Sequence, residues 1–439
     1  MALWNSVSDV FTSLTTHIRR FAYDDSTPTD FNKRFGNVTV VSIYLVTWNV
    51  NGKPPPSDFT DLLQLNRNPL PEIYCIGLQE MGVQSWESAL MTALKPFDYV
   101  KIKSRQLVGI LTIMFVHRNC LQHVTSVESE LTRSGLAGFY GNKGAASIRM
   151  DFMGMNLIVV NCHLAAHMEN VAERLNNIDQ ILSTQQFRDP DTDNILDHDY
   201  IFWMGDMNFR IEETTYEKAL ELIDLRNFKK LYRNDQLYIA IQEGLIFDMF
   251  QEGTITFPPT YKFDPGTDKY DSSAKRRIPA YCDRILYHFH DTAYGNLKLQ
   301  AKLIEYICHP HYKMSDHKPV SAIISFKAIS KGTINLITFR LPNKVWNKKK
   351  EETVSYLVRK DFRMNSGDWI GLFKEDFQDF DSFVTYVWAN TKTPLSPSHP
   401  VSVHFSSFQQ MGLSAGKYVL CYLTKKASLC GVSPLIEIV

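Results

Sequence analysis

Apolar and polar positions follow two different periods along this chain. From about residue 38, apolar runs of strand length alternate with segments in which apolar residues recur at helical spacing. This alternation is typical of a layered α/β domain. The predicted strands span residues 40–48, 73–78, 109–116, 145–150, 157–163, 200–204, 284–288 and 320–326. The predicted helices span residues 58–65, 86–94, 170–186 and 216–222.

The pattern changes after Gly332. The rest of the sequence consists of short strand-like runs separated by turns, at residues 334–339, 353–358, 369–373, 383–388, 401–405, 418–423 and 435–439. About seven short strands in roughly 110 residues predict a small β-sandwich. We therefore expect an N-terminal tail at residues 1–36, an α/β domain at residues 37–328 and a β-sandwich domain at residues 329–439.

Composition narrows the function classes. The 439 residues include 47 Lys and Arg and 47 Asp and Glu, so no net field attracts DNA or an anionic membrane. Seven cysteines without a Cys-x-x-Cys pair argue against a disulfide framework or a zinc ribbon, and favour the reducing cytosol. No apolar run approaches the roughly 18 residues of a spanning helix, so we expect a protein that is neither secreted nor integral to a membrane.

The N-terminal tail has a pattern of its own. Apolar residues recur at helical spacing from Trp4 to Phe21, with His17, Arg19 and Arg20 near the end. Both an interfacial membrane helix and a helix that packs on the body of the chain fit this pattern.

Several predicted strands are followed by a polar residue able to do chemistry. Asn49, Glu80, His163 and Asp206 each lie at the end of such a run. Ligand sites of layered α/β folds gather at strand ends, so we expect these residues to share one cleft. Glu80 and Asn49 are hard oxygen donors, and such donors in an open site predict Mg²⁺.

The motif at residues 203–210 places two polar side chains beyond one strand. Asp206 and Asn208 are two positions apart, so both side chains can contact the same small molecule. We expect that molecule to be an attacking water, with the carboxylate taking its proton and the amide orienting it.

Histidines provide candidate contacts to a phosphate. His317 comes just before the last predicted strand, with Asp316 next to it, and Asp283 is a candidate partner that would fix the His317 tautomer. His163 is a similar candidate, whereas His167 could equally cap or pack.

Basic residues precede the second motif, at residues 279–286. Lys262, followed by Lys275, Arg276 and Arg277, would reach phosphates beside the one being cut. As an alternative, loops of this kind are ordinary solvated surface.

A glycine-framed loop offers a further phosphate contact. Asn142 and Lys143 lie between two glycines, where backbone N–H groups and one lysine can meet a phosphate. Just upstream is an apolar loop that contains Leu136, Phe139 and Tyr140. These three side chains could enter a bilayer, or they could pack beneath their own loop.

Together these motifs resemble those of the inositol polyphosphate 5-phosphatases, over residues 40–326. The matching segments, in order, are residues 78–80, the Asn142 loop, and residues 162–167, 203–210, 258–264, 279–286 and 315–320. The resemblance implies the fold of the endonuclease/exonuclease/phosphatase superfamily, an α/β sandwich of two packed sheets flanked by helices. It also implies Mg²⁺-dependent, in-line attack of water on a 5-phosphate.

The resemblance implies a role for each matching position. These roles are metal binding for Glu80 and Asn49, activation of water for Asp206 and Asn208, binding of the scissile phosphate for His163 and for His317 oriented by Asp283, binding of the 4-phosphate for Tyr261, Lys262, Lys275 and Arg277, and binding of the 1-phosphate for Asn142 and Lys143. Two positions depart from the family pattern. Tyr281 replaces the usual tryptophan, which is expected to reshape one wall of the cleft, and Ala145 replaces a common glycine.

The sequence after Gly332 resembles the SKICH domain, a small β-sandwich module, most closely at residues 368–372 and 386–388. That resemblance implies a membrane-targeting or partner-binding unit. A catalytic domain followed directly by this module is the layout of the SKICH-containing subgroup of 5-phosphatases.

The resemblance as a whole implies a cytosolic enzyme, peripheral at the plasma membrane or endoplasmic reticulum. Its expected substrates are phosphatidylinositol 4,5-bisphosphate and 3,4,5-trisphosphate, with soluble inositol phosphates as further candidates. One alternative is a nuclease or sphingomyelinase of the same superfamily, although the neutral charge argues against nucleic acid as a partner. Another is a catalytically silent scaffold, against which the intact Glu80, Asp206, Asn208 and His317 argue.

Overall fold

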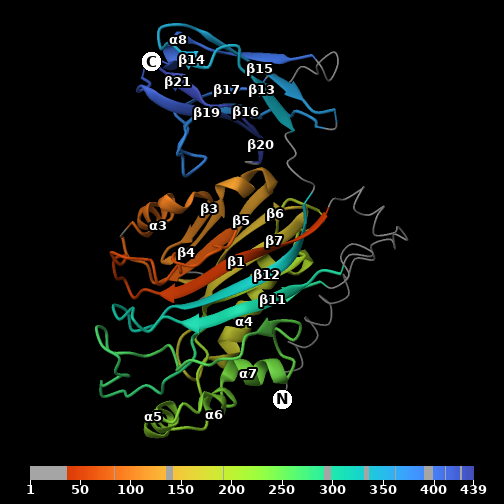
Figure 1. Ribbon diagram of the computed structural model, residues 1–439. Coiled ribbons are helices and arrows are strands. Elements are labelled where there is room, and N and C mark those ends of the chain that lie inside the picture. The colour runs from red at the N-terminus through yellow and green to blue at the C-terminus, as the bar shows by residue number, and fades with distance from the viewer. Residues whose placement is uncertain are drawn as a thin grey trace.

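The computed structural model describes residues 37–439 except residues 84, 135–141, 191, 291–297, 331–335, 361, 390–398, 411 and 426–427. The predicted N-terminal helix and the apolar loop of Leu136, Phe139 and Tyr140 lie outside the described residues. Figure 1 shows a two-sheet body with a smaller all-β module, drawn in blue, beside it.

Two six-stranded sheets pack face to face in the larger domain (Figure 1). Apolar side chains such as Ile43, Met114 and Phe202 fill the space between them. The first sheet runs in the order β11 (Ala301–Cys308), β12 (Val320–Ser330), β1 (Asn37–Asn49), β2 (Ile73–Gln79), β4 (Ile110–His117) and β3 (Tyr99–Leu107). The second runs in the order β5 (Val124–Ser134), β6 (Lys143–Phe152), β7 (Met155–His163), β8 (Tyr200–Asp206), β10 (Asp283–Phe289) and β9 (Gln251–Glu252). The two packed sheets expected from the family resemblance are therefore observed.

Helices cover the outer faces of both sheets. Trp86 and Leu90 of α3 pack on the first sheet, and Leu175 and Ile178 of α4 pack on the second. The α-helices of this domain are α3 (Trp86–Leu94), α4 (Val171–Thr184), α5 (Tyr216–Asp224), α6 (Phe228–Tyr232) and α7 (Gln236–Gln242), and the 3₁₀ helices are η2 (Lys95–Phe97), η3 (Arg118–His123) and η5 (Ile195–Asp197). Within the part of the chain that the structure describes, no helix combines the length and apolarity needed to span a membrane.

Strand position explains which strands the hydrophobic pattern predicts. All residues of β2 are buried because a sheet or helix covers each of its faces, so its sequence is a continuous apolar run. By contrast, β3, β5 and β11 lie at sheet edges and carry many polar residues. These three edge strands are therefore absent from the predicted strands, because their polar residues interrupt any apolar run.

The helix predicted at residues 58–65 is wrong. The segment forms turns instead, in which the Asp58 carboxylate accepts a hydrogen bond from the backbone N–H of Thr60. Gln64 has a φ angle of +48°, which lies outside the right-handed helical region and stops any helix there.

The C-terminal module is a β-sandwich, as predicted. In β15 buried residues alternate with more exposed ones, so Val354, Tyr356 and Val358 point into its core. Its first sheet consists of β13 (Ile337–Arg340), β15 (Glu352–Val358) and β18 (Val401–Phe405). Its second consists of β14 (Val345–Trp346), β21 (Ile436–Ile438), β19 (Gly416–Leu423), β16 (Trp369–Lys374) and β17 (Thr385–Trp388), with β20 (Leu429–Val432) paired to β19 and the short helix α8 (Ser407–Gln410) nearby in sequence.

A polar contact joins this module to edge strand β3. Lys101 in β3 is only 8% exposed, and its ammonium pairs with Asp379 of the module and, at 2.5 Å, with Glu87 of α3. The Lys101 backbone N–H also donates to the Gln378 carbonyl at 2.7 Å. The segment between β16 and β17 therefore caps β3, whose edge would otherwise expose unpaired backbone groups.

Aromatic residues extend the same contact. Phe373, Phe377 and Phe380 of the module belong to the apolar cluster that fills the space between the two large sheets. The Arg118 guanidinium lies 4.6 Å from the centroid of the Phe377 ring. The two domains therefore share one continuous core.

Candidate active site

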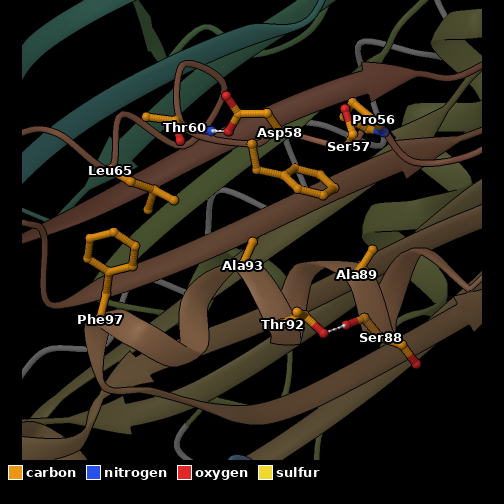
Figure 2. Close-up of a pocket in the computed structure, with 11 residues that line it drawn as sticks. Pro56, Ser57, Asp58, Thr60, Leu65, Ser88, Ala89, Thr92, Ala93 and Phe97 are labelled. Carbon is orange, nitrogen blue, oxygen red and sulfur yellow. Dashed lines mark hydrogen bonds between the residues drawn. The ribbon is translucent and has the colours of Figure 1, made fainter.

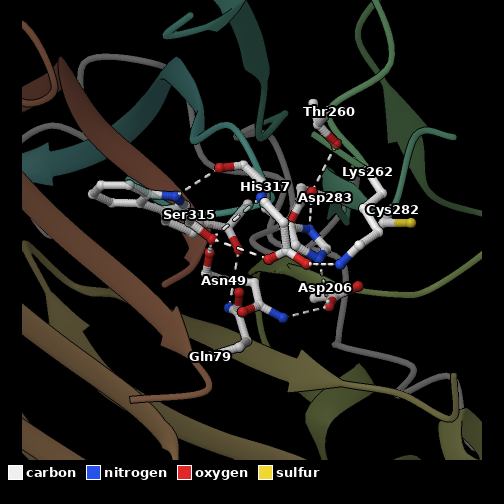
Figure 3. Close-up of polar contacts among 12 residues, drawn as sticks. Asn49, Gln79, Asp206, Thr260, Lys262, Cys282, Asp283, Ser315 and His317 are labelled. Carbon is white, nitrogen blue, oxygen red and sulfur yellow. Dashed lines mark hydrogen bonds and ion pairs between the residues drawn. The ribbon is translucent and has the colours of Figure 1, made fainter. Parts of the chain in front are cut away.

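The strand ends meet at one edge of the larger domain, as the sequence predicted. In the second sheet, Asp206 at the end of β8 is the Cα partner of His163 in β7 and of Asp283 in β10. In the first sheet, the parallel strands β1 and β2 end side by side at Asn49 and Gln79. Segments far apart in sequence thus contribute side chains to one small volume (Figure 3).

Asp206 lies at the centre of this cluster. Its side chain is 1% exposed, and its Oδ2 accepts a hydrogen bond from Asn49 Nδ2 at 2.9 Å. The same oxygen lies 3.2 Å from His163 Nε2 and 3.8 Å from His317 Nε2. Burial raises the pKa of Asp206, but the charge of His317 and the hydrogen bond with His163 outweigh burial and hold this pKa well below its ordinary value. Asp206 is therefore an ionised acceptor.

His317 is held by a chain of hydrogen bonds. Its Nδ1 lies 2.9 Å from Asp283 Oδ2, and the Thr260 hydroxyl donates to the same oxygen at 2.6 Å (Figure 3). Burial lowers the pKa of His317, but the charges of Asp283 and Asp206 outweigh it and raise this pKa to about 9. The ring is therefore an imidazolium at neutral pH, with Nε2 directed toward Asp206.

The second histidine has the opposite protonation. Burial lowers the pKa of His163, and the nearby Lys143 ammonium lowers it further. Lys143 Nζ contacts His163 Nε2 directly. The cluster thus pairs one cationic imidazole with one imidazole whose cationic form is disfavoured.

Asn208 is fixed in the left-handed region of the backbone, with a φ angle of +56°, which asparagine tolerates better than most residues. Its backbone N–H donates to Asp206 Oδ1 at 3.1 Å. Its carboxamide donates to the Leu164 carbonyl at 3.1 Å and accepts from Arg210 at 2.5 Å. The side chain therefore has a defined orientation beside Asp206.

A metal ion fits one part of this edge better than another. Ligand atoms of Asp206, Asp283 and His317 lie within 4.8 Å of one another. However, His317 Nδ1 and Asp283 Oδ2 already share a hydrogen bond, which a metal ion bound to these atoms would break. The Glu80 side chain is 46% exposed, with its carboxylate 3.6 Å from His163 Nε2, so it can bind a hydrated cation without breaking that pair. Asn49 is next to Asp206, and its Oδ1 accepts from the Asn51 backbone.

The predicted phosphate-binding residues divide into two groups. The Tyr261 ring lies 4.6 Å from the His317 ring, and Lys262 Nζ lies 2.5 Å from Asp316 Oδ2, so both adjoin the cluster. Lys143 is also there, through its contact with His163. The others lie farther out: Asn142 and Lys275 are exposed, and Arg277 pairs with Asp271 at 2.9 Å.

Four supporting residues were not singled out from the sequence. Thr260 bonds to Asp283, Ser315 Oγ donates to the Asn49 carbonyl at 2.6 Å, and Trp48 Nε1 donates to the His317 carbonyl at 3.1 Å. The fourth, Arg210, contacts Asn208. All four lie within or next to the predicted motifs, but only the tertiary structure gives their partners.

A separate groove lies outside this cluster. It has a volume of about 430 Å³ and runs between the 56–65 segment and α3, with Phe59, Leu65 and Phe97 among its lining residues (Figure 2). None of the predicted site residues lines it.

Comparison with known proteins agrees with this geometry. Residues 46–323 match the endonuclease/exonuclease/phosphatase family 2, and residues 337–438 match the SKICH domain. Inositol polyphosphate 5-phosphatase K of Mus musculus is 35% identical over 425 residues, which cover 91% of this chain and 90% of that protein. Phosphatidylinositol 4,5-bisphosphate 5-phosphatase A of Homo sapiens is 35% identical over 419 residues, which cover 90% of this chain but only 41% of that protein.

A solved structure gives the same result. The inositol polyphosphate 5-phosphatase domain of SPsynaptojanin, in complex with inositol (1,4)-bisphosphate and calcium ion, is 33% identical, with a TM-score of 0.62, and the match covers 74% of this chain and 91% of that one. The predicted fold and family are thereby confirmed. The chain belongs to the inositol polyphosphate 5-phosphatases of the endonuclease/exonuclease/phosphatase superfamily, in the subgroup that carries a SKICH domain.

Proposed function

We propose that this protein is a Mg²⁺-dependent phosphatase that removes the 5-phosphate from phosphatidylinositol 4,5-bisphosphate and phosphatidylinositol 3,4,5-trisphosphate, and from soluble inositol phosphates. One observation carries the proposal: Asp206, Asp283 and His317 converge from separate strand ends to within 4.8 Å. The nuclease and sphingomyelinase alternatives lack comparable support, because the named relatives are 5-phosphatases.

Asp206 and Asn208 would position the attacking water. The Asp206 carboxylate is ionised and can accept a hydrogen bond from water at Oδ2, which directs the water lone pair toward phosphorus. The Asn208 carboxamide is held at both ends, so its remaining N–H and lone pair have fixed directions. Such pre-orientation reduces the entropic part of the barrier.

His317 would bind the phosphate that is cut. Its Nε2–H is a charged donor at neutral pH, and phosphate gains negative charge at its oxygens as the leaving group departs. Asp283 keeps the proton on Nδ1 and so keeps Nε2–H facing the substrate. His163 would supply a second contact.

Glu80, with Asn49 beside it, would hold the divalent cation. Support comes from the exposed Glu80 carboxylate and from the oxygen chemistry of both side chains, which suits Mg²⁺. When bound, the ion would offset negative charge on the scissile phosphate.

Residues around the cluster would select the substrate. Tyr261 and Lys262 adjoin His317 and are placed to read a phosphate next to the one being cut, whereas Lys275 and Arg277 would reach it from the outer loop. Asn142 and Lys143 would contact the phosphate at the lipid-bearing position. The C-terminal module would recruit the enzyme to a membrane surface or a protein partner, as a peripheral protein.

The test is phosphate release from soluble inositol phosphates and short-chain lipids with a 5-phosphate, measured with Mg²⁺ and with EDTA. Asp206→Asn should abolish release, and Asp224→Asn, which changes an exposed carboxylate at the end of α5, is the matched control. Release that persists in EDTA would refute the metal requirement. Hydrolysis of DNA or sphingomyelin without hydrolysis of any 5-phosphate would refute the proposed activity.

A further inference from the structure

The buried Arg210 makes two contacts that the proposed mechanism does not use. Its side chain bonds to Asn208, through Nε to the backbone carbonyl at 3.1 Å and through the guanidinium to Oδ1 at 2.5 Å. The same guanidinium lies 4.3 Å from the centroid of the Tyr261 ring. One side chain thus contacts both the residue that would orient water and a residue that would read a neighbouring phosphate.

We propose that Arg210 is a positioning residue that fixes the orientation of the Asn208 carboxamide and links that orientation to the occupancy of the neighbouring-phosphate site at Tyr261. The inference rests on the proposed function, because it assigns Arg210 a part in 5-phosphate hydrolysis. It would make the phosphate next to the scissile group a determinant of turnover as well as of binding.

The first half of the proposal follows from hydrogen-bond chemistry. A carboxamide can exchange its oxygen and nitrogen by a half turn, and only its partners decide between the two orientations. Arginine has donors and no acceptor, so the Asn208 oxygen must face Arg210. The Asn208 nitrogen then faces the Leu164 carbonyl, with a donor distance of 3.1 Å. Without the guanidinium, one end of the amide loses its partner and the orientation is no longer determined.

The second half follows from the position of Tyr261. Its ring contacts the Arg210 guanidinium and, with centroids 4.6 Å apart, the His317 imidazole. Tyr261 also pairs through its backbone with Ala280, with hydrogen bonds of 3.2 and 2.8 Å. These bonds fix the backbone of Tyr261, and its ring packs against both the Arg210 and the His317 side chains. A phosphate bound at Tyr261 and Lys262 would press the ring against Arg210 and so restrict Asn208.

Lysine and methionine separate the two roles. Lysine keeps a cationic donor that can reach Asn208 Oδ1, but it lacks the planar group that stacks on Tyr261. Methionine lacks both. Arg210→Lys should therefore keep part of the turnover and lose the dependence on the neighbouring phosphate, whereas Arg210→Met should lose both.

The experiment compares kcat and KM for two soluble inositol phosphates that carry a 5-phosphate and differ only in the 4-phosphate. For Arg210→Met we expect kcat on the 4-phosphorylated substrate to fall roughly 100-fold with KM changed less than about threefold. The ratio of kcat between the two substrates should approach 1 in both variants. Arg118→Met, which removes an arginine stacked on Phe377 far from the cluster, is the matched control and should keep the wild-type ratio.

A double-mutant cycle tests whether Arg210 acts through Asn208. In the Asn208→Ala background, Arg210→Met should cost less than about threefold in kcat, because the group that it positions is already gone. Full additivity of the two losses would overturn the positioning role. A wild-type kcat in Arg210→Met, or an unchanged substrate ratio in both variants, would overturn the link to Tyr261.

A readout without turnover separates this inference from the proposed function. The carboxamide protons of Asn208, detected through their ¹⁵N, should exchange slowly with solvent in the wild type and rapidly in Arg210→Met. Arg210→Lys should show a smaller increase in the exchange rate. If the wild type hydrolyses no 5-phosphate, the proposed function fails while this measurement still decides whether Arg210 holds Asn208. Thermal unfolding identifies folded variants, and Arg210→Lys carries the test if the methionine variant does not fold.

Discussion

The buried pair of His317 and Asp283 leads to a quantitative prediction about pH. Burial lowers the pKa of His317, but the charges of Asp283 and Asp206 raise it from 6.5 to about 9. This difference corresponds to about 3 kcal/mol in favour of the imidazolium. Because the pKa is raised, the imidazolium is present below about pH 9 and is lost as the pH rises through that value.

Asp283→Asn removes the charge and keeps the shape of the side chain. The amide oxygen can still accept from Nδ1–H, but the largest of the charges that oppose burial is lost, and only the smaller effects of Asp206 and Asp316 remain. We expect the pKa of His317 to fall to its ordinary value of 6.5 or below. At about pH 7.5 the protonated fraction then drops from roughly 97% to about 9% or less, so kcat/KM falls at least about tenfold. The basic limb of the pH profile should move to lower pH by the same amount as the pKa of His317.

The assay is kcat/KM measured from about pH 5.5 to 10, together with an ¹⁵N titration of the His317 ring. Thr260→Val is the matched control, because it removes the 2.6 Å hydrogen bond to Asp283 and keeps the carboxylate charge. Its basic limb should remain near that of the wild type. If Asp283→Asn is folded and still loses activity only near pH 9, the charge of Asp283 does not set the protonation of His317, and the reasoning is refuted.

Three further predictions concern other parts of the molecule. Asp206→Ala should lower kcat by roughly three orders of magnitude while substrate binding, measured by equilibrium titration, survives; a kcat within tenfold of wild type would contradict this. Lys275→Ala should weaken the preference for 4-phosphorylated substrates, seen as a smaller ratio of kcat/KM values; an unchanged ratio would remove Lys275 from the site. Phe377→Ala should lower the free energy of unfolding by about 3 kcal/mol in chemical denaturation, because it opens a cavity in the shared core and removes the partner of Arg118.

The central part of the site could be predicted because it lies at the ends of buried strands. Apolar runs that stop at a polar residue placed Asp206, His163 and Asn49 at one edge, and the register of the strands puts them there. The sequence could not show that Thr260 bonds to Asp283, because the two residues come from different segments that meet only after folding.

The unpredicted strand β3 and the wrongly predicted helix have similar physical causes. Edge strand β3 contains Lys101 and other polar residues, so its sequence has no apolar run that would predict a strand. The partners of Lys101 come from α3 and from the C-terminal module, which is distant in sequence. The wrong helix at residues 58–65 had a helical spacing of apolar residues, but Phe59 and Leu65 are buried from turns instead. A periodic pattern indicates which side chains are buried without fixing the backbone that buries them.

The contact between Asp379 and Lys101, with the phenylalanines packed behind it, has a geometric consequence for the whole enzyme. Because the two domains are anchored to each other, a ligand bound to the SKICH module would also set the direction in which the active site faces. If the module recruits the enzyme as proposed, a ligand that bound it from an unfavourable side would hold the enzyme with its active site turned away from the proposed lipid substrate.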